Sequence, residues 1–340
     1  MSEAKRLHDR LVCKFGLSLK VPLSTYVHQE GPDCVSLPYL KPTHLLHVLL
    51  TKHPWILFGG FDGPHPEALL KSFWSCYQKE HPEHEVFKNP ERLGSTFPIT
   101  VHGDGGRTQK KQPLAIFSFQ PVLGLNTASQ RSMSCKCPTS ASFGGSDLQN
   151  PAVQCLNSKH STYLTHFLLF AFPSKKYSSF DNLLTSFLKE VMDDLARACE
   201  EGITLDSGTV YYAACIGFKL DMEWMVKVGS LTRSYQNVGH VTSHPCCHEC
   251  DAGQAMVPFE DVNPSAAWMN TRFNTIPWTD QPPWDKIPFD DSKPAKFLRR
   301  DAFHIFRLGI CRNFLGSSIY LLIYMGCFLI LLGLHVLCFL

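Results

Sequence analysis

The sequence predicts a mixed α/β fold, in which a sheet of parallel and antiparallel strands carries helices on its faces. Two observations predict this class. Four short apolar runs have the composition of strands, at about residues 97–103, 113–121, 163–172 and 208–219. One long amphipathic run near residues 180–200 separates the third of them from the fourth. A third observation adds a separate element, because residues 314–340 contain no Asp, Glu, Lys or Arg.

Composition sets broad limits on function. The chain has 340 residues, enough for one large domain or two ordinary ones. Its formal net charge of +2 carries no overall signature of nucleic-acid binding, although a local basic patch remains compatible with it. The first 20 residues are charged and lack the long apolar stretch of a secretory signal, so the 14 cysteines are expected to be free thiols or metal ligands.

Residues 1–95 are expected to form an N-terminal region rich in helices and loops. Residues 42–60 carry a short helical pattern. Residues 66–80 place apolar side chains at helical spacing, after a proline that suits a first helical turn. His81 and Pro82 are expected to end this helix.

Residues 96–313 are expected to form the main domain. Strands near 97–103 and 113–124 flank a basic turn, which indicates a hairpin. The third strand precedes the best helix of the chain, residues 178–202, which Gly202 ends. A fourth strand then stops at Asp221. The expected order is that of an RNase H-like fold: three strands are joined by hairpins or loops, and a fourth strand is reached across a helix.

Three aspartates lie where strands or helices meet loops. Asp104 ends the first strand, Asp221 ends the fourth, and Asp301 opens an expected final helix with His304 on the same face. In an RNase H-like sheet the first and fourth strands are neighbours. Three carboxylates at one edge would suit two Mg²⁺ or Mn²⁺ ions that catalyse phosphoryl transfer. The alternative is that each aspartate is an ordinary turn or cap residue.

A cysteine–histidine cluster follows the fourth strand. Cys247 and Cys250 form a CxxC pair, whose spacing lets two thiolates bind one tetrahedral Zn²⁺. No His or Cys occurs between Cys250 and His304, so further ligands are expected upstream, at His240 and His244 among others, or from a distant segment. The alternative is a pair of reduced thiols under a loop.

Two short basic segments are candidates for contacts with a DNA backbone, or else for ordinary solvated surface. The first lies in the expected hairpin and the second surrounds the expected final helix. Their members are Arg107, Lys110, Lys111, Arg299, Arg300 and Arg307.

These residues together resemble the catalytic region of CACTA-type (En/Spm-like) DNA transposases, in a divergent, transposon-derived form. The resemblance rests on the ordered segments VHGDG, KLDMEW, CHEC and DAFHIFRLGICRN, which span about residues 96–318. It implies Mg²⁺-dependent cleavage and joining of DNA at Asp104, Asp221 and Asp301, and a nuclear location. The alternative within this reading is a catalytically inactive, zinc-containing module that binds DNA or protein.

The apolar run 314–340 raises a third hypothesis. At about 1.5 Å per residue, a helix of this length would cross a hydrocarbon core of roughly 30 Å. The sequence therefore predicts a C-terminal apolar helix that continues from Asp301 and inserts into a lipid bilayer. The chain would then be a tail-anchored membrane protein of unknown role, with its basic flank on the cytoplasmic side.

Overall fold

The computed structural model describes residues 20–59, 66–107, 113–123, 166–220, 222–234, 245–300 and 311–325. The chain divides into two compact units, Met1–Leu298 and Arg299–Leu340. Each unit is described by itself.

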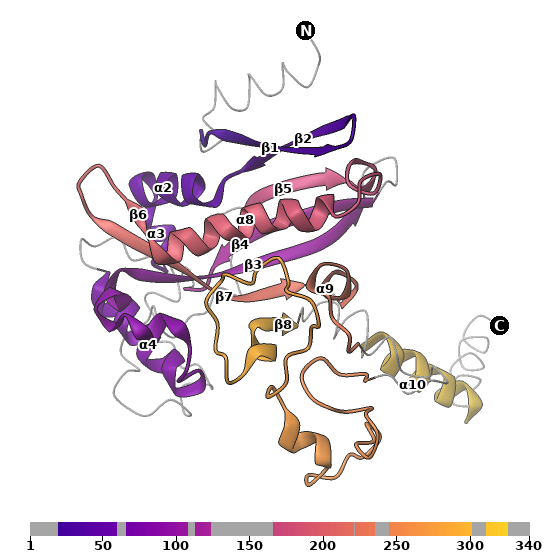
Figure 1. Cartoon of the computed structure of the whole chain (residues 1–340). Coiled ribbons are helices and arrows are strands. Elements are labelled where there is room, and N and C mark those ends of the chain that lie inside the picture. Colours follow the sequence, from indigo (N-terminus) through magenta and orange to yellow (C-terminus); the bar gives the residue numbers. More distant parts are fainter. Residues whose placement is uncertain are drawn as a thin grey trace, which may run out of the picture. The chain divides into compact units, whose positions relative to one another are not determined.

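The centre of the first unit is a mixed sheet with the strand order β5-β4-β3-β7-β6 (Figure 1). Strand β4 pairs antiparallel with both β3 and β5, whereas β7 pairs parallel with β3. The chain reaches β7 from β5 through the long helix α8 (Leu183–Glu200). The predicted mixed α/β sheet with helices is therefore confirmed. Its strands are β3 (Thr96–Arg107), β4 (Pro113–Pro121), β5 (Phe167–Pro173), β6 (Ile203–Thr204) and β7 (Val210–Leu220).

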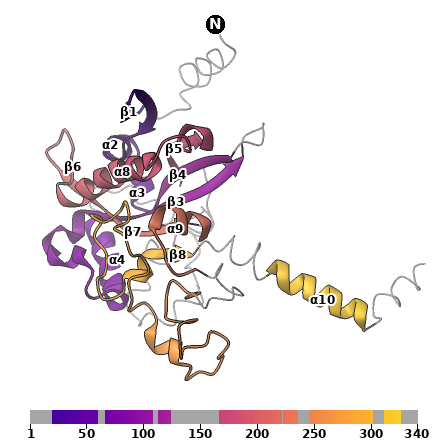
Figure 2. The same cartoon turned by 45° about the vertical axis from the view of Figure 1, so that its right-hand side comes forward.

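One face of this sheet is apolar and is covered by α8. Phe97, Ile99 and Val101 alternate along β3 and are fully buried, as expected for strand residues that share one face. On the same face Phe117 of β4 stacks on Phe170 of β5, whose ring meets Phe187 of α8 with 4.8 Å between centroids. Helix α8 lies beside the strands in both views and, in Figure 1, runs roughly along their direction (Figures 1 and 2). The intervening residues of β3 point to the opposite face.

A β-bulge in β7 changes which of its residues share a face with those of β3. Ile99 pairs with Cys215 but Val101 pairs with Phe218, so three residues of β7 match two of β3. The extra residue reverses the alternation of β7 from that point. Phe218 consequently faces the apolar side, where its ring lies 4.7 Å from that of Trp284, and Lys219 faces the other side.

The N-terminal part of the unit contains a hairpin that the sequence did not lead us to expect. Strands β1 (Leu23–Glu30) and β2 (Asp33–Leu40) pair antiparallel around a turn in which Gly31 has a φ of 59°. The helical patterns at 42–60 and 66–80 are confirmed. The elements that follow the hairpin are α2 (Pro42–Lys52), α3 (Pro54–Leu57), α4 (Glu67–Glu80), η2 (Glu85–Lys88) and η3 (Pro90–Ser95).

A buried carboxylate joins α8 to the start of α2. Asp194 of α8 is 1% exposed, and its side chain accepts hydrogen bonds from the backbone N–H of Thr43 (2.8 Å) and from the Thr43 hydroxyl (3.1 Å). Arg197 donates to the same carboxylate at 2.9 Å, and the Lys41 ammonium lies 3.5 Å from it. Asp194 therefore caps α2 from another helix and complements its positive end.

The rest of the first unit is a helix followed by long, irregular segments. Helix α9 (Met222–Gly229) follows β7 directly, and Trp224 from it packs against Phe117. The segment after the cysteine cluster contains only short helices among its described residues, η8 (Ala267–Thr271) and η9 (Pro294–Phe297). Strand β8 (Leu298–Arg300) crosses the boundary between the units.

The second unit contradicts the expected membrane helix. Residues 298–300 are a strand, and the described helix α10 begins only at Arg312 and ends at Tyr324. Its 13 residues span about 20 Å, which is shorter than a hydrocarbon core of roughly 30 Å. Among the residues that the structure describes, no helix is long and apolar enough to cross a membrane. The fold class is corrected accordingly; residues 326–340 lie outside the described part.

Candidate functional site

The face of the sheet opposite α8 is polar at its centre. We call it the polar face and define it by side chains from four adjacent segments. Sheets in globular proteins commonly bury apolar side chains at such central positions, so hydrogen-bonding groups there indicate a site. Its members are Thr100, His102 and Asp104 of β3, Ser118 and Gln120 of β4, Lys219 of β7, and His166 just before β5.

Strand register brings these residues together. His102 is opposite Ser118 on β4 and beside Lys219 on β7, the other neighbour of β3. The Lys219 ammonium donates to the Gln120 side-chain oxygen at 3.1 Å. Gln120 and Ser118 are buried, and Lys219 and His102 are half-buried. The polar face therefore combines a fixed, buried amide with a cation that remains partly accessible.

The histidine at the start of β5 lies next to this cation. The rings of His166 and His102 are 6.1 Å apart between centroids, at an angle of 77°. Burial lowers the pKa of His166 below its ordinary value, and His102 and Lys219 lower it further. His166 is consequently neutral at pH 7 and able to accept a hydrogen bond.

Asp104 is half-buried on the polar face, near the end of β3. The residue before it, Gly103, pairs with Leu220, the last residue of β7. A Cβ atom at Gly103 would lie 2.5 Å from Leu220 Cδ2 and 2.7 Å from Phe117 Cζ. Glycine is therefore required next to Asp104, because a side chain there would collide with the residues that β4 and β7 place against β3.

The other predicted catalytic residues fall outside the described part of the chain. Asp221, Asp301 and His304 belong to this group. The described neighbours of Asp221 are Leu220, which ends β7, and Met222, which begins α9. Three other members of the polar face, His102, His166 and Lys219, were not singled out from the sequence. The spacing of His102 and Asp104, two apart on a strand, was the one signal available for them.

The predicted basic residues are only partly described. Arg107 is the last residue of β3 and pairs with Pro113. Arg299 and Arg300 belong to β8, and the Arg299 side chain is half-buried. Lys110, Lys111 and Arg307 lie outside the described residues.

The two cysteines of the CxxC pair lie in a tight loop. Cys250 is buried and Cys247 half-buried, and the backbone N–H of Glu249 donates to Cys247 Sγ at 3.4 Å. Burial raises the pKa of Cys250 to about 12, and Cys247 adds to the shift. The adjacent Cys246 donates its thiol hydrogen to the carbonyl of Ala252 at 3.3 Å.

A single arginine fixes this loop to a segment about 25 residues further along. The guanidinium of Arg233 is 7% exposed, and it donates to the Cys250 carbonyl (3.0 Å) and to the Asp251 carboxylate (2.9 Å). The same group donates to the carbonyls of Thr275 (3.4 Å) and Ile276 (3.2 Å). In the described part of the chain, no group of three or more His, Cys, Asp or Glu residues is placed to hold a metal ion. His240 and His244 lie outside that part.

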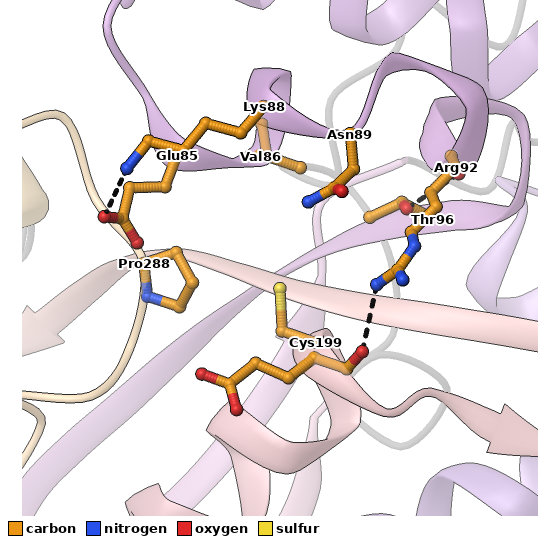
Figure 3. Close-up of a pocket in the computed structure, with 9 residues that line it drawn as sticks. Glu85, Val86, Lys88, Asn89, Arg92, Thr96, Cys199 and Pro288 are labelled. Carbon is orange, nitrogen blue, oxygen red and sulfur yellow. Dashed lines mark hydrogen bonds and ion pairs between the residues drawn. The ribbon is translucent and has the colours of Figure 1, made fainter.

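A separate pocket opens near the start of β3 (Figure 3). Its volume is about 270 Å³, and Lys88, Arg92, Glu85 and Glu200 give it charges of both signs. Lys88 pairs with Glu85 at 2.9 Å, and Arg92 donates to the Glu200 carbonyl at 3.0 Å. Both cations, Lys88 and Arg92, therefore already bind groups of the protein itself. None of the residues predicted to form a site lines this pocket.

The pocket contains a cysteine whose reactivity can be predicted. Burial, together with Glu200 and Glu85, raises the pKa of Cys199 to about 12, and burial does the same for Cys215. Both thiols are therefore protonated at pH 7.5, and the thiolate is the nucleophile. We expect iodoacetamide to label exposed Cys34 well before either of them, as followed by mass spectrometry of timed samples. Equal rates in the native protein would contradict this, whereas in urea the rates should converge.

No protein-family model matches the chain, and no curated protein or solved structure is significantly similar to it. Its function therefore has to be inferred from its own residues and their geometry.

Proposed function

We propose that the main domain is derived from a transposase and that it cuts and joins DNA strands with the help of divalent metal ions. Asp104, Asp221 and Asp301 would hold Mg²⁺ or Mn²⁺, with His304 beside them. The observation that carries the proposal is the parallel pairing of Gly103 with Leu220, next to Asp104.

The register gives the physical reason. Parallel strands run in the same direction, so the residues that follow a paired position lie at the same edge of the sheet. Asp104 follows Gly103 and Asp221 follows Leu220, each by one peptide unit, which separates consecutive Cα atoms by about 3.8 Å. Two carboxylates at one sheet edge are ligands that Mg²⁺ and Mn²⁺ prefer.

The chemistry would be divided between ions and protein. When bound, a pair of divalent ions activates the attacking oxygen and stabilises the leaving one. The chain would contribute the carboxylates, the space that Gly103 leaves for the side chain of Leu220, and the basic residues that contact the DNA backbone. The proposed backbone contacts are Arg107, Lys110, Lys111, Arg299, Arg300 and Arg307.

The experiment that tests this function is a nicking assay on supercoiled plasmid DNA with the full chain. We expect conversion to open-circular DNA in Mg²⁺ or Mn²⁺ and none in EDTA. Binding of the plasmid without nicking in either metal would favour the inactive DNA-binding module. If the chain neither binds nor nicks the plasmid, the proposal is refuted.

We further propose that Zn²⁺ is bound by Cys247 and Cys250, with His240 and His244 completing the site. The side chains of Cys247 and Cys250 lie close enough to interact, which supports them as neighbouring ligands, although the described residues contribute only half of a tetrahedral site. The role would be structural, since four protein ligands leave no open position for a substrate.

The zinc proposal makes a direct prediction. Metal analysis of the purified chain should find about one zinc ion per molecule, the content of one tetrahedral site, and Cys247→Ser should lose it. Cys246→Ser is the matched control, because the thiol of Cys246 already donates to the Ala252 carbonyl, and it should retain the metal. Absence of zinc, with Cys247 and Cys250 both freely reactive toward a thiol reagent, would show that the pair is not a metal site.

A further inference from the structure

We infer that Cys247 and Cys250 form a reversible disulfide when the chain meets a peroxide, so that the CxxC pair is a site of oxidative modification. The disulfide is independent of the proposed DNA chemistry. It shares its sulfur atoms with the proposed zinc site and gives that loop a second chemical state. Oxidation and zinc binding would exclude each other, because a cysteine binds a metal as its thiolate.

The two side chains already meet in the reduced chain. A hydrogen bond joins the thiols of Cys247 and Cys250, and CxxC pairs are the common reactive dithiols of proteins. Cys246 is a poorer partner for Cys247. Their Cα atoms are about 3.8 Å apart, as across any trans peptide bond, whereas the Cα atoms of a disulfide are usually about 4.4–6.8 Å apart. The thiol of Cys246 is also directed elsewhere, since it donates to the Ala252 carbonyl at 3.3 Å.

The loop that carries the pair is held by contacts that do not involve either sulfur. The backbone N–H of Cys246 donates to the Ala252 carbonyl at 3.1 Å and closes the loop. Arg233 donates to the Cys250 carbonyl at 3.0 Å. Two thiols fixed beside each other react at a high effective concentration, because little freedom of motion is lost when they join. These contacts also survive oxidation, so the disulfide can form within the folded chain.

Exposure decides which sulfur reacts first. Cys247 is half-buried and open to a small oxidant, whereas Cys250 is only 4% exposed. Hydrogen peroxide transfers one oxygen atom to the sulfur of Cys247, which becomes a sulfenic acid, and leaves as water. The sulfur of Cys250 then attacks that of Cys247 and displaces its hydroxyl, which takes the Cys250 thiol proton and leaves as a second water. Two thiols are thereby oxidised by one peroxide, and a dithiol reductant reverses the step by exchange.

The test uses the full chain, freed of metal by a chelator and treated with hydrogen peroxide near neutral pH. Remaining thiols are blocked with iodoacetamide, and trypsin digestion of the unfolded product releases residues 234–272, which hold Cys246, Cys247 and Cys250. We expect this peptide to carry one blocked cysteine and to lack two hydrogen atoms at the other two. Treatment with dithiothreitol before blocking should restore three blocked cysteines.

Variants identify the pair. Cys247→Ser and Cys250→Ser should each lose the internal disulfide, and in Cys250→Ser the sulfur of Cys247 should go on to the sulfinic acid, which dithiothreitol does not reverse. Cys246→Ser is the matched control and should form the disulfide as the wild-type chain does. The wild-type peptide and this control decide the result even if a variant of the pair does not fold.

Two results would overturn the inference: Cys247 and Cys250 both blocked after peroxide in the wild-type chain, or a disulfide that is lost in Cys246→Ser. The outcome is separate from that of the zinc proposal. A chain that binds zinc but forms no disulfide when freed of metal would overturn only the oxidation site. A chain that forms the disulfide but binds no zinc would support the oxidation site and overturn only the zinc proposal.

Discussion

Replacing Asp104 with Asn is expected to reduce metal-dependent nicking of supercoiled DNA about a thousandfold. Asparagine has nearly the same size and retains the strand position opposite Ile116, so the fold should be preserved. It lacks the negative charge that a divalent ion requires. Loss of about 4 kcal/mol of transition-state stabilisation, within the several kcal/mol that a metal ion supplies, corresponds to this factor.

The matched control for Asp104 is Asp206→Asn. Asp206 is an exposed aspartate in the turn before β7, and its replacement should leave nicking unchanged. Far-ultraviolet circular dichroism and the unfolding midpoint should be the same for both variants and for the wild-type chain. Nicking by Asp104→Asn at the wild-type rate would exclude Asp104 as a metal ligand.

Replacing Asp194 with Ala is expected to lower the free energy of unfolding by about 3 kcal/mol. The carboxylate caps α2 through the N–H and hydroxyl of Thr43, and it also accepts from Arg197. Loss of a helix cap costs about 1 kcal/mol, and loss of a hydrogen bond involving a charged group costs about 1.5–3 kcal/mol. Urea unfolding monitored by circular dichroism measures this total change in the free energy of unfolding.

Asp193→Ala is the matched control for Asp194→Ala, because Asp193 is the neighbouring residue in α8. Asp193 is 28% exposed and pairs with Lys286 and Lys189 at the surface, where such pairs contribute about 0–1 kcal/mol. Its replacement should therefore have a much smaller effect. Equal stability of the two variants would show that the link from α8 to α2 contributes little.

The sequence was sufficient to predict the four longer strands of the main sheet, β3, β4, β5 and β7, and the helix α8, whereas the short strands β6 and β8 were not predicted. Their signals are local: alternating apolar residues bounded by turns, and apolar positions in α8 at spacings of three and four residues. The hairpin of β1 and β2 was missed because its local signals are weak. Pro38 lies within β2, and a proline inside an apolar run argues against a strand when only the sequence is read.

The polar face could not be predicted, because it depends on register. Lys219 shares a face with His102 only because the bulge in β7 adds one residue between the pairs at Ile99 and Val101. Without that residue, strict alternation would place Lys219 on the apolar side. The C-terminal helix failed for a different reason: an uncharged composition shows apolar character but not helix length, and the sequence places Gly326, the kind of residue that commonly ends a helix, directly after the Met325 C-cap.

The hydrogen bonds of the Arg233 guanidinium hold the cysteine loop in place whether or not a metal ion is bound to its thiols. Its N–H groups donate to the loop at Cys250 and Asp251 and to the distant backbone at Thr275 and Ile276. These hydrogen bonds join the two segments without a metal ion. If zinc is removed, the loss of order should stay local to the thiols. The proposed metal and the arginine would then stabilise the cysteine loop independently, and the loop would separate from the segment at Thr275 and Ile276 only when both are lost.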